Sequence, residues 1–341
     1  MINKILITGG AGYIGNKLIQ SLPDTSEVII VDNFHINTSY KQTVNEQLKN
    51  SRKVTLIKAN VSDVEKYKDT LMDVDVVLYM ASLNSWQESN LNPLHYLREN
   101  NINLQVFVVA LKKYSTKLKK IILTSTRSVY GEGTYICNSC HKRFCPTLSE
   151  SLKCNFCKND DISPRKIKET DRPNPSSYYG LTKKIQEDLL KMFCLQNNIA
   201  LDIFRIFNVY GEGQGKYYSN IGVIPQMFEQ IKNNKEIYMS GNGEITRDYV
   251  YIGDIVNILL RSIFNSKSKT DIEVYNLGSG QGVSINNLSQ YFEGLGYNFD
   301  KKKLKHYGDI KYSVAENSKL MKNFNIKKFM DLYTFLSKNY K

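Results

Sequence analysis

Short apolar runs alternate with amphipathic stretches along the first half of the chain. The apolar runs have the length of buried strands, and the stretches between them repeat their apolar positions with helical spacing. Strands separated by helices imply right-handed βαβ crossovers and a parallel sheet that is covered on both faces. The expected strands are Lys4–Thr8, Glu27–Asp32, Val54–Ala59, Val74–Ala81, Lys119–Thr126 and Leu201–Phe207, and the expected helices are Ile14–Leu22, Asp63–Leu71, Pro93–Ser115 and Ser177–Gln196.

The later part of the chain is less regular, and glycine pairs mark turns in it. With 341 residues, the chain is long enough for one large domain and a smaller lobe. We therefore expect an α/β fold with a doubly wound parallel sheet of the Rossmann type and a smaller C-terminal substrate-binding lobe. The expected turns are Gly241-Asn242-Gly243, Gly278-Ser279-Gly280 and Gly294-Leu295-Gly296.

A glycine-rich segment, Gly9-Gly10-Ala11-Gly12-Tyr13-Ile14-Gly15, joins the first expected strand to the first expected helix. Glycines allow the backbone to turn tightly and to approach a pyrophosphate, while the helix N-terminus offers amide donors to the phosphates. Asp32 ends the second strand, where a carboxylate accepts hydrogen bonds from a ribose 2′-hydroxyl and repels a 2′-phosphate. A plain strand–helix turn is the alternative, but this context favours dinucleotide binding, with NAD preferred over NADP.

Tyr179 and Lys183 are four residues apart on an expected helix, so their side chains share a face. A tyrosine is a weak base at neutral pH, and a nearby ammonium favours its phenolate. Thr126 ends a strand and can present its hydroxyl to the same substrate oxygen. The three residues predict acid–base chemistry on a hydroxyl group, although a surface helix with an aromatic residue would show the same spacing. Tyr178 lacks a lysine four residues later, because Thr182 stands there.

Together these segments resemble the extended short-chain dehydrogenase/reductases, in particular their NAD-dependent epimerase/dehydratase branch. The resemblance covers nearly the whole chain. It includes the glycine segment, Thr124–Gly131, Tyr179–Lys183, Arg205–Gly211, Thr246–Tyr249 and Tyr275–Gly280.

The resemblance also implies roles for residues that spacing alone does not assign. Asn208 and Arg247 would contact the diphosphate of a nucleotide sugar, and Arg127, Ser128 and Lys311 would complete the substrate site. Members of the family commonly form homodimers through two helices of each subunit, here Pro93–Ser115 and Ser177–Gln196. The residues expected to bind the cofactor are Gly9, Gly12, Tyr13, Ile14, Gly15, Asp32, Asn33, Asn60, Val61, Ala81, Asn100, Tyr179 and Lys183.

The residues before Val129-Tyr130-Gly131 separate the reactions of this family. Dehydratases carry an acid pair there and decarboxylases usually carry a glutamate, whereas this chain has Arg127 and Ser128. Epimerisation needs only the hydroxyl, tyrosine and lysine groups with a tightly held NAD. We expect a nucleotide-sugar 4-epimerase that oxidises carbon 4 transiently and returns the hydride to the other face. A nucleotide-sugar 4-keto reductase or dehydrogenase and, more distantly, a non-enzymatic Rossmann redox sensor stay open as alternatives.

Two Cys-x-x-Cys pairs, Cys137/Cys140 and Cys154/Cys157, lie between the two catalytic segments. Two knuckles at this distance suit a tetrahedral four-cysteine zinc site, and four protein ligands leave no open position, which indicates a structural zinc in a ribbon-like module. Unpaired thiols in a loop and a redox-sensitive zinc lock are the alternatives. His141 and Cys145 are close enough in sequence to replace a ligand.

The position of this insertion, together with Arg127, is similar to that of the subgroup that epimerises dTDP-L-rhamnose at carbon 4. The substrate would then be a dTDP-6-deoxyhexose, with a UDP-hexose as the alternative. One departure concerns the C-terminal part, where His306 and Lys311 stand at positions that are arginines in the subgroup. Lysine lacks the bidentate fork of arginine, so the preferred nucleotide or sugar can differ.

Domain boundaries follow from these motifs. We expect an NAD-binding domain over 1–207, interrupted by the four-cysteine insertion at 133–168 and rejoined by 247–270, and a nucleotide-sugar-binding lobe over 208–246 and 271–341. The net charge is +13, but the lysines are spread along the chain, which argues against nucleic acid as a partner. The sequence shows neither a secretory leader nor an apolar run long enough for a membrane, so we expect a cytoplasmic protein.

Overall fold

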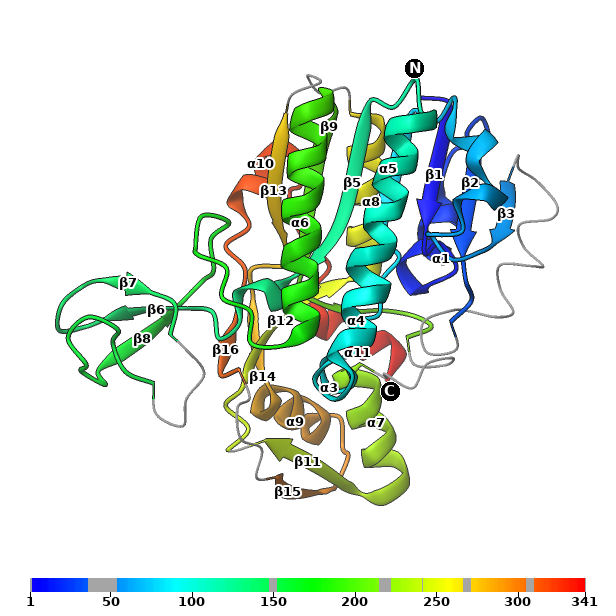
Figure 1. The fold of residues 1–341 in the computed structure, drawn as a ribbon. Helices are drawn as coiled ribbons and strands as arrows, with labels where there is room; N and C mark the ends of the chain where they lie inside the picture. Colours follow the sequence, from blue (N-terminus) through cyan, green and yellow to red (C-terminus); the bar gives the residue numbers. More distant parts are fainter. Residues whose placement is uncertain are drawn as a thin grey trace.

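A seven-stranded parallel sheet forms the centre of the fold in the computed structural model (Figure 1). The strand order is β13-β9-β5-β4-β1-β2-β3, so the chain reverses its direction of winding between β1 and β4. This order confirms the expected doubly wound α/β fold. The strands are β1 (Lys4–Thr8), β2 (Glu27–Asp32), β3 (Val54–Lys58), β4 (Val76–Tyr79), β5 (Lys120–Thr126), β9 (Ala200–Ile206) and β13 (Ile272–Leu277). The structure describes residues 2–35, 54–146, 152–214, 222–240, 242–265, 271–304 and 310–340.

Helices cover both faces of this sheet, because its strands are apolar on both sides. In β1, Ile5 and Ile7 belong to one buried cluster and Leu6 to the other. The first cluster is closed by α1 (Tyr13–Ser21), α8 (Ile252–Phe264) and α10 (Ser318–Asn323). The second is closed by α5 (Asn103–Tyr114) and α6 (Tyr178–Asn197). Each fully buried aliphatic side chain contributes about 1.5–3 kcal/mol relative to its exposed state.

Three elements differ from the expectation. The stretch Asp63–Leu71 forms two short 3₁₀ turns, η1 (Val64–Lys66) and η2 (Lys68–Leu71), instead of one α-helix. The stretch Pro93–Ser115 divides into α4 (Pro93–Leu97), a π-helical segment η3 (Arg98–Ile102) and α5. The seventh strand, β13, was not expected, since Glu273 and Asn276 interrupt its apolar run. It pairs with β9 in the large sheet, whereas the expected boundary placed 271–341 in the smaller lobe.

The smaller lobe lies below the carboxyl ends of the large sheet (Figure 1). Its core contains aromatic residues such as Tyr210 and Phe292 and aliphatic residues such as Leu288. No helix in the parts of the chain that the structure describes could cross a membrane. The elements of the lobe are β10 (Asn208–Tyr210), α7 (Val223–Asn234), β11 (Glu236–Ser240), β12 (Thr246–Tyr251), β14 (Gly282–Ser284), α9 (Ile285–Gly294), β15 (Asp300–Leu304), β16 (Tyr312–Ser313) and α11 (Leu332–Asn339).

The cysteine-containing segment forms a small three-stranded antiparallel sheet that projects from the body of the protein (Figure 1). Its strands are β6 (Thr134–Cys137), β7 (Arg143–Phe144) and β8 (Ile162–Arg165). Asp171 ties its base to the body, because its carboxylate accepts hydrogen bonds from Thr134 Oγ1 at 2.8 Å and Arg143 Nε at 2.8 Å. These bonds fix how the projecting module leaves the main fold.

Candidate active site

A cavity of about 710 Å³ opens at the carboxyl ends of β1, β2, β4 and β5. In doubly wound sheets this edge, where the winding reverses, is the usual ligand site. The cavity brings together most of the residues that the sequence assigned to the cofactor and to catalysis. The predicted residues that line it are Gly9, Gly12, Tyr13, Ile14, Gly15, Asp32, Asn33, Asn60, Val61, Ala81, Thr126, Tyr179, Lys183 and Asn208.

The glycine loop has no room for side chains. A Cβ on Gly9 would lie 2.7 Å from the Ala81 backbone nitrogen, and a Cβ on Gly15 would lie 2.5 Å from the Gly10 carbonyl oxygen. Gly9 also has φ +69°, which favours glycine. Helix α1 begins after Gly12 without a side-chain cap and without an acidic residue in its first turn. Its first amides are therefore available to an anion such as a pyrophosphate.

Asp32 holds the loop and also faces the cavity. Its Oδ2 accepts a hydrogen bond from Ala11 N at 2.9 Å, and its Oδ1 accepts one from Phe34 N at 2.7 Å. The carboxylate also lines the cavity, at the end of β2, where the ribose of a dinucleotide would lie. The loop, the uncapped helix and this carboxylate fit a dinucleotide.

Tyr179 and Thr126 meet through their side chains. Burial raises the pKa of Tyr179 to about 12, and the hydrogen bond to Thr126 and the charge of Arg127 oppose this rise. Thr126 is held in turn, since its Oγ1 accepts a hydrogen bond from Ser128 N at 3.2 Å. Arg127 is thus a second cation near the tyrosine hydroxyl, in addition to Lys183, which lines the same cavity.

Arg127 reaches Tyr179 because two elements pack closely. The 3₁₀ turn η4 (Arg127–Tyr130) lies on the first turn of α6, where a Cβ on Gly180 would come within 2.5 Å of the Ser128 carbonyl oxygen. Among the described residues, the buried Nη1 of Arg127 has no hydrogen-bond partner. Burial, and then the nearby charge of Arg247, lower the pKa of Arg127 to about 9. An unpaired buried donor of this kind is costly unless a ligand accepts from it.

Arg247, another predicted substrate residue, lies close enough to Arg127 to lower its pKa, and the buried Glu132 lies close enough to raise it. Burial raises the pKa of Glu132, while Arg247 and Lys311 oppose this rise. The Glu132 carboxylate accepts a hydrogen bond from Lys311 N at 2.8 Å, and the Lys311 side chain is exposed. Arg127 beside Tyr179, with Arg247 near Arg127, makes this side of the site positive. His306 lies outside the described residues.

Lys183 is almost fully buried, and burial lowers its pKa to about 7, although the charge of Glu187 opposes this. Its Nζ donates a hydrogen bond to Gln186 Oε1 at 2.9 Å. Glu187 is engaged elsewhere: Arg205 Nη2 approaches its Oε2 at 2.7 Å, and Ser125 Oγ donates to its Oε1 at 2.6 Å. This buried ion pair fixes α6 against β5 and β9 beneath the site.

Asn100, which was expected near the cofactor, lies behind the cavity wall. Its side chain is fully buried and donates hydrogen bonds to Leu83 O at 3.1 Å and Thr182 Oγ1 at 2.9 Å. It also accepts a hydrogen bond from Leu83 N at 2.8 Å. Asn100 therefore supports the segment after β4, which itself lines the cavity, and does not belong to the lining residues.

Several lining residues were missed by the sequence analysis. The segment Ser82–Gln87 follows β4 and covers one side of the cavity, and it includes Trp86, the single tryptophan of the chain. Glu99 and Tyr249 contribute from η3 and β12. The sequence could have indicated only the segment Ser82–Gln87, because residues that directly follow a parallel strand lie at the edge of the sheet where ligands bind.

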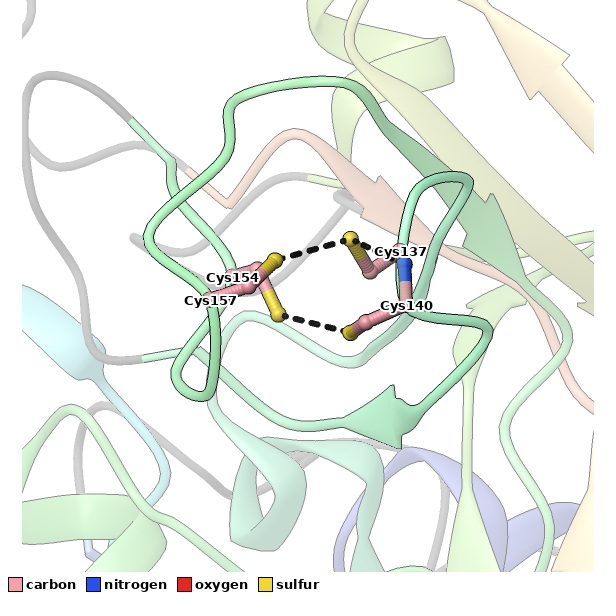
Figure 2. Close-up of side chains that lie close together, drawn as sticks. All are labelled: Cys137, Cys140, Cys154 and Cys157. Carbon is pink, nitrogen blue, oxygen red and sulfur yellow. Dashed lines mark hydrogen bonds between the residues drawn. The ribbon is translucent and has the colours of Figure 1, made fainter.

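The four predicted cysteine ligands converge in the projecting module (Figure 2). Their sulfur atoms all lie within 4.8 Å of one another, with Cys137 Sγ 3.5 Å from Cys157 Sγ and Cys140 Sγ 3.6 Å from Cys154 Sγ. A tetrahedral zinc with Zn–S bonds of about 2.3 Å places its sulfurs about 3.8 Å apart. The donor set and its spacing therefore fit zinc.

Both knuckles share one backbone shape. The residue after each second cysteine, His141 and Lys158, has a positive φ, and its amide donates back to the carbonyl of the first cysteine. The amides of Cys140 and Phe156 point at the sulfurs of Cys137 and Cys154, at 3.5 and 3.4 Å. Donors of this kind stabilise thiolates. Within the described residues, neither His141 nor Cys145 joins the cluster.

Comparison with known proteins places the chain among sugar-nucleotide enzymes. The sequence profile of the NAD dependent epimerase/dehydratase family matches residues 5–278. A dTDP-L-rhamnose 4-epimerase from Burkholderia thailandensis is 27% identical over 84% of this chain and 79% of its own length. These matches confirm the family that the motifs indicated.

Solved structures give the same result. The UDP-N-acetylglucosamine 4-epimerase from Methanobrevibacter ruminantium M1, in complex with UDP-N-acetylmuramic acid, is 27% identical with a TM-score of 0.78 and coverage of 98% of this chain and 96% of that one. The UDP-glucuronic acid 4-epimerase from Bacillus cereus, in complex with UDP-glucuronic acid and NAD, is 25% identical with a TM-score of 0.80 and coverage of 99% and 98%.

Proposed function

Because the chain belongs to the NAD dependent epimerase/dehydratase family, we propose that it is an NAD-dependent nucleotide-sugar 4-epimerase, acting on a dTDP-6-deoxyhexose such as dTDP-L-rhamnose. The observation that carries this proposal is the meeting of Thr126, Tyr179 and Lys183 at one cavity with the glycine loop and Asp32. Relatives that epimerise carbon 4 of dTDP-L-rhamnose and of UDP-sugars support the reaction class.

The proposed chemistry divides acid–base work among four side chains. Tyr179 takes the proton of the sugar 4-hydroxyl and later returns it, and Thr126 donates a hydrogen bond to the same oxygen. Lys183 and Arg127 favour the phenolate of Tyr179 by their positive charge. When bound along the glycine loop, with Asn33, Asn60, Val61 and Ala81 beside it, NAD supplies reversible hydride exchange at carbon 4.

The positive site beside Tyr179 is the proposed place of the substrate. Asn208 and Arg247 would bind the diphosphate, and Arg127, Ser128 and Lys311 would contact the sugar and its neighbouring phosphate. Arginine suits this role because its fork matches phosphate oxygens. The absence of a carboxylate at Arg127 and Ser128 favours epimerisation over dehydration, since no acid stands there to drive water loss.

We also propose that Cys137, Cys140, Cys154 and Cys157 hold a structural zinc. The support is the sulfur spacing and the donation of backbone amides to two of the sulfurs. With four protein ligands, such an ion has no position for a substrate. The zinc would therefore order the module and take no part in the reaction.

The domain division is proposed in a revised form. Residues 1–207, without the insertion at 133–168, would form the NAD-binding domain together with 252–270, β13 and α10. Residues 208–251 and the remainder of 271–341 would form the substrate lobe. The packing of α8 on α1 and the pairing of β13 with β9 support this division.

We propose that the protein forms a homodimer through the outer faces of α5 and α6. These helices lie side by side on one side of the sheet (Figure 1). Exposed apolar residues repeat along them with helical spacing. We expect light scattering to show that the parent protein is a dimer. Met192→Glu should give a monomer, whereas Met330→Glu, a control elsewhere on the surface, should stay dimeric. A monomeric parent protein would contradict the proposal. The exposed residues are Ile102 at the end of η3, Val106 and Val109 on α5, and Tyr178, Leu181, Met192 and Leu195 on α6.

The proposed function is tested by incubating the protein with a panel of dTDP-, UDP-, GDP- and CDP-hexoses. We expect NMR to show inversion at carbon 4, with dTDP-L-rhamnose among the substrates, and no net change in the absorbance of reduced cofactor. The alternative, a 4-keto reductase or dehydrogenase, predicts net consumption or formation of NADH. Lack of binding to every nucleotide sugar by calorimetry would instead favour a non-enzymatic role.

A further inference from the structure

Gln186 connects the lysine of the site to a distant part of the chain. Its side chain is fully buried, one turn after Lys183 on α6, and its Oε1 accepts the hydrogen bond from Lys183 Nζ at 2.9 Å. A lysine side chain has four rotatable bonds, so its ammonium occupies a fixed place only where such partners hold it. Gln186 is one of those partners.

The NH₂ group of the Gln186 amide is held by the main chain of η3. Gln186 Nε2 donates to Asn100 O at 2.6 Å, across 86 residues of sequence. A carbonyl can only accept a hydrogen bond, so it requires the NH₂ group of the amide and turns the amide oxygen toward Lys183. The orientation that binds the ammonium therefore follows from the position of this one carbonyl.

That carbonyl is itself well held. Asn100 lies in the π-helical segment, a feature that often marks functional sites. Its side chain bonds to both backbone groups of Leu83 and to Thr182 Oγ1, next to Lys183 in the chain. The wall of the cavity, the π-helical segment and the lysine thus form one connected set of hydrogen bonds.

We propose that Gln186 is a positioning residue for the epimerisation, holding the ammonium of Lys183 toward the cavity and keeping it protonated. The proposal rests on the proposed function for its catalytic consequence. Gln186 occupies one of the three donors of the ammonium, which leaves two for groups on the cavity side. It does not line the cavity and so acts through Lys183.

Replacing Gln186 should change the pKa of Lys183, in a direction that depends on whether the new side chain stabilises the buried ammonium. Burial lowers the pKa of Lys183 to about 7, so protonation is lost as the pH rises through this region. An acceptor stabilises the charged form, and its loss lowers the pKa further, whereas a carboxylate in its place raises it. The charge that acts on Lys183 is Glu187 on α6, which is bound to Arg205 of β9. Tyr179 of α6 and Glu99 of η3 line the same cavity, Arg127 of η4 lies near Tyr179, and the end of β5 offers hydroxyls.

The test compares Gln186→Leu and Gln186→Glu with the control Gln196→Leu, which is exposed on the same helix. Gln186→Leu should lower kcat by about 10- to 100-fold with KM changed less than about twofold, because a bond to a charged group is lost. The basic limb of its kcat–pH profile should move to lower pH. Gln186→Glu should move this limb to higher pH, and Gln196→Leu should leave it in place.

NAD binding provides a second test, which needs no sugar. Trp86, the single tryptophan, lines the cavity, so its fluorescence reports NAD binding to the protein freed of cofactor. NAD affinity should fall as Lys183 deprotonates, at lower pH in Gln186→Leu than in the parent. A shift seen without turnover of any sugar would support the positioning role and contradict the proposed function. Unchanged pH profiles in both variants, in a protein that epimerises its sugar, would overturn the positioning role alone.

Discussion

Replacing Tyr179 by phenylalanine is expected to lower kcat by about a thousandfold, because the substitution removes the group that exchanges a proton with the sugar hydroxyl. NAD should stay bound, since the ring remains and the glycine loop and Asp32 are unchanged. Turnover is measured by NMR on the nucleotide sugar that the parent protein converts, and bound NAD by its absorbance after the protein is denatured.

Tyr178→Phe is the matched control. Tyr178 is the preceding residue and is 43% exposed, so loss of its hydroxyl should leave kcat within about twofold. If Tyr179→Phe kept the activity of the parent protein, the tyrosine would not be the acid–base group. Loss of bound NAD together with activity would also contradict the assignment, because it would place the role of the residue in cofactor binding.

Loss of the four-cysteine site is expected to unfold the projecting module. Apparent zinc affinities of about 10–16 kcal/mol in zinc-finger peptides show how much folding free energy such an ion supplies. Elemental analysis of the protein purified without chelator should give about one zinc per chain. Cys154→Ser should lose this zinc, and limited proteolysis should then cut between residues 133 and 168 while the large sheet stays intact.

Cys145→Ser controls for the loss of a thiol in the same module. Its sulfur lies 3.7 Å from Thr134 Oγ1 and outside the four-cysteine cluster, so the zinc content should not change. A parent protein without metal would refute the zinc site. Full zinc content in Cys154→Ser would show instead that His141 or Cys145 can serve as a ligand, against the arrangement in the structure.

The cofactor half of the site was largely predictable from local sequence. The glycine segment lies between a strand and a helix, and Asp32 ends the next strand, so their placement at one edge follows from the rules of parallel sheets. The four cysteines were equally predictable, because each pair forms a knuckle within four residues. The glycine segment and Asp32 lie at the ends of adjacent strands, and each cysteine pair lies within a single turn of the chain.

The remaining features depend on long-range packing. Gln186 and Asn100 are joined by a hydrogen bond across the fold, and no periodic pattern marks either residue. The influence of Arg127 on Tyr179 depends on the close approach of η4 to Gly180. Strand β13 was missed because its polar residues have partners that sequence does not show: Asn276 bonds to Tyr130 and to the backbone of Ile167.

In the proposed reaction, carbon 4 is inverted by removal and return of its own hydride. It is tested most directly with dTDP-L-rhamnose, or the nucleotide sugar that proves to be converted, carrying deuterium at carbon 4. We expect the 4-epimer to keep this deuterium and, in a second reaction of unlabelled sugar in D₂O, to gain none from solvent. Loss of the label to water, or inversion at another carbon, would contradict it.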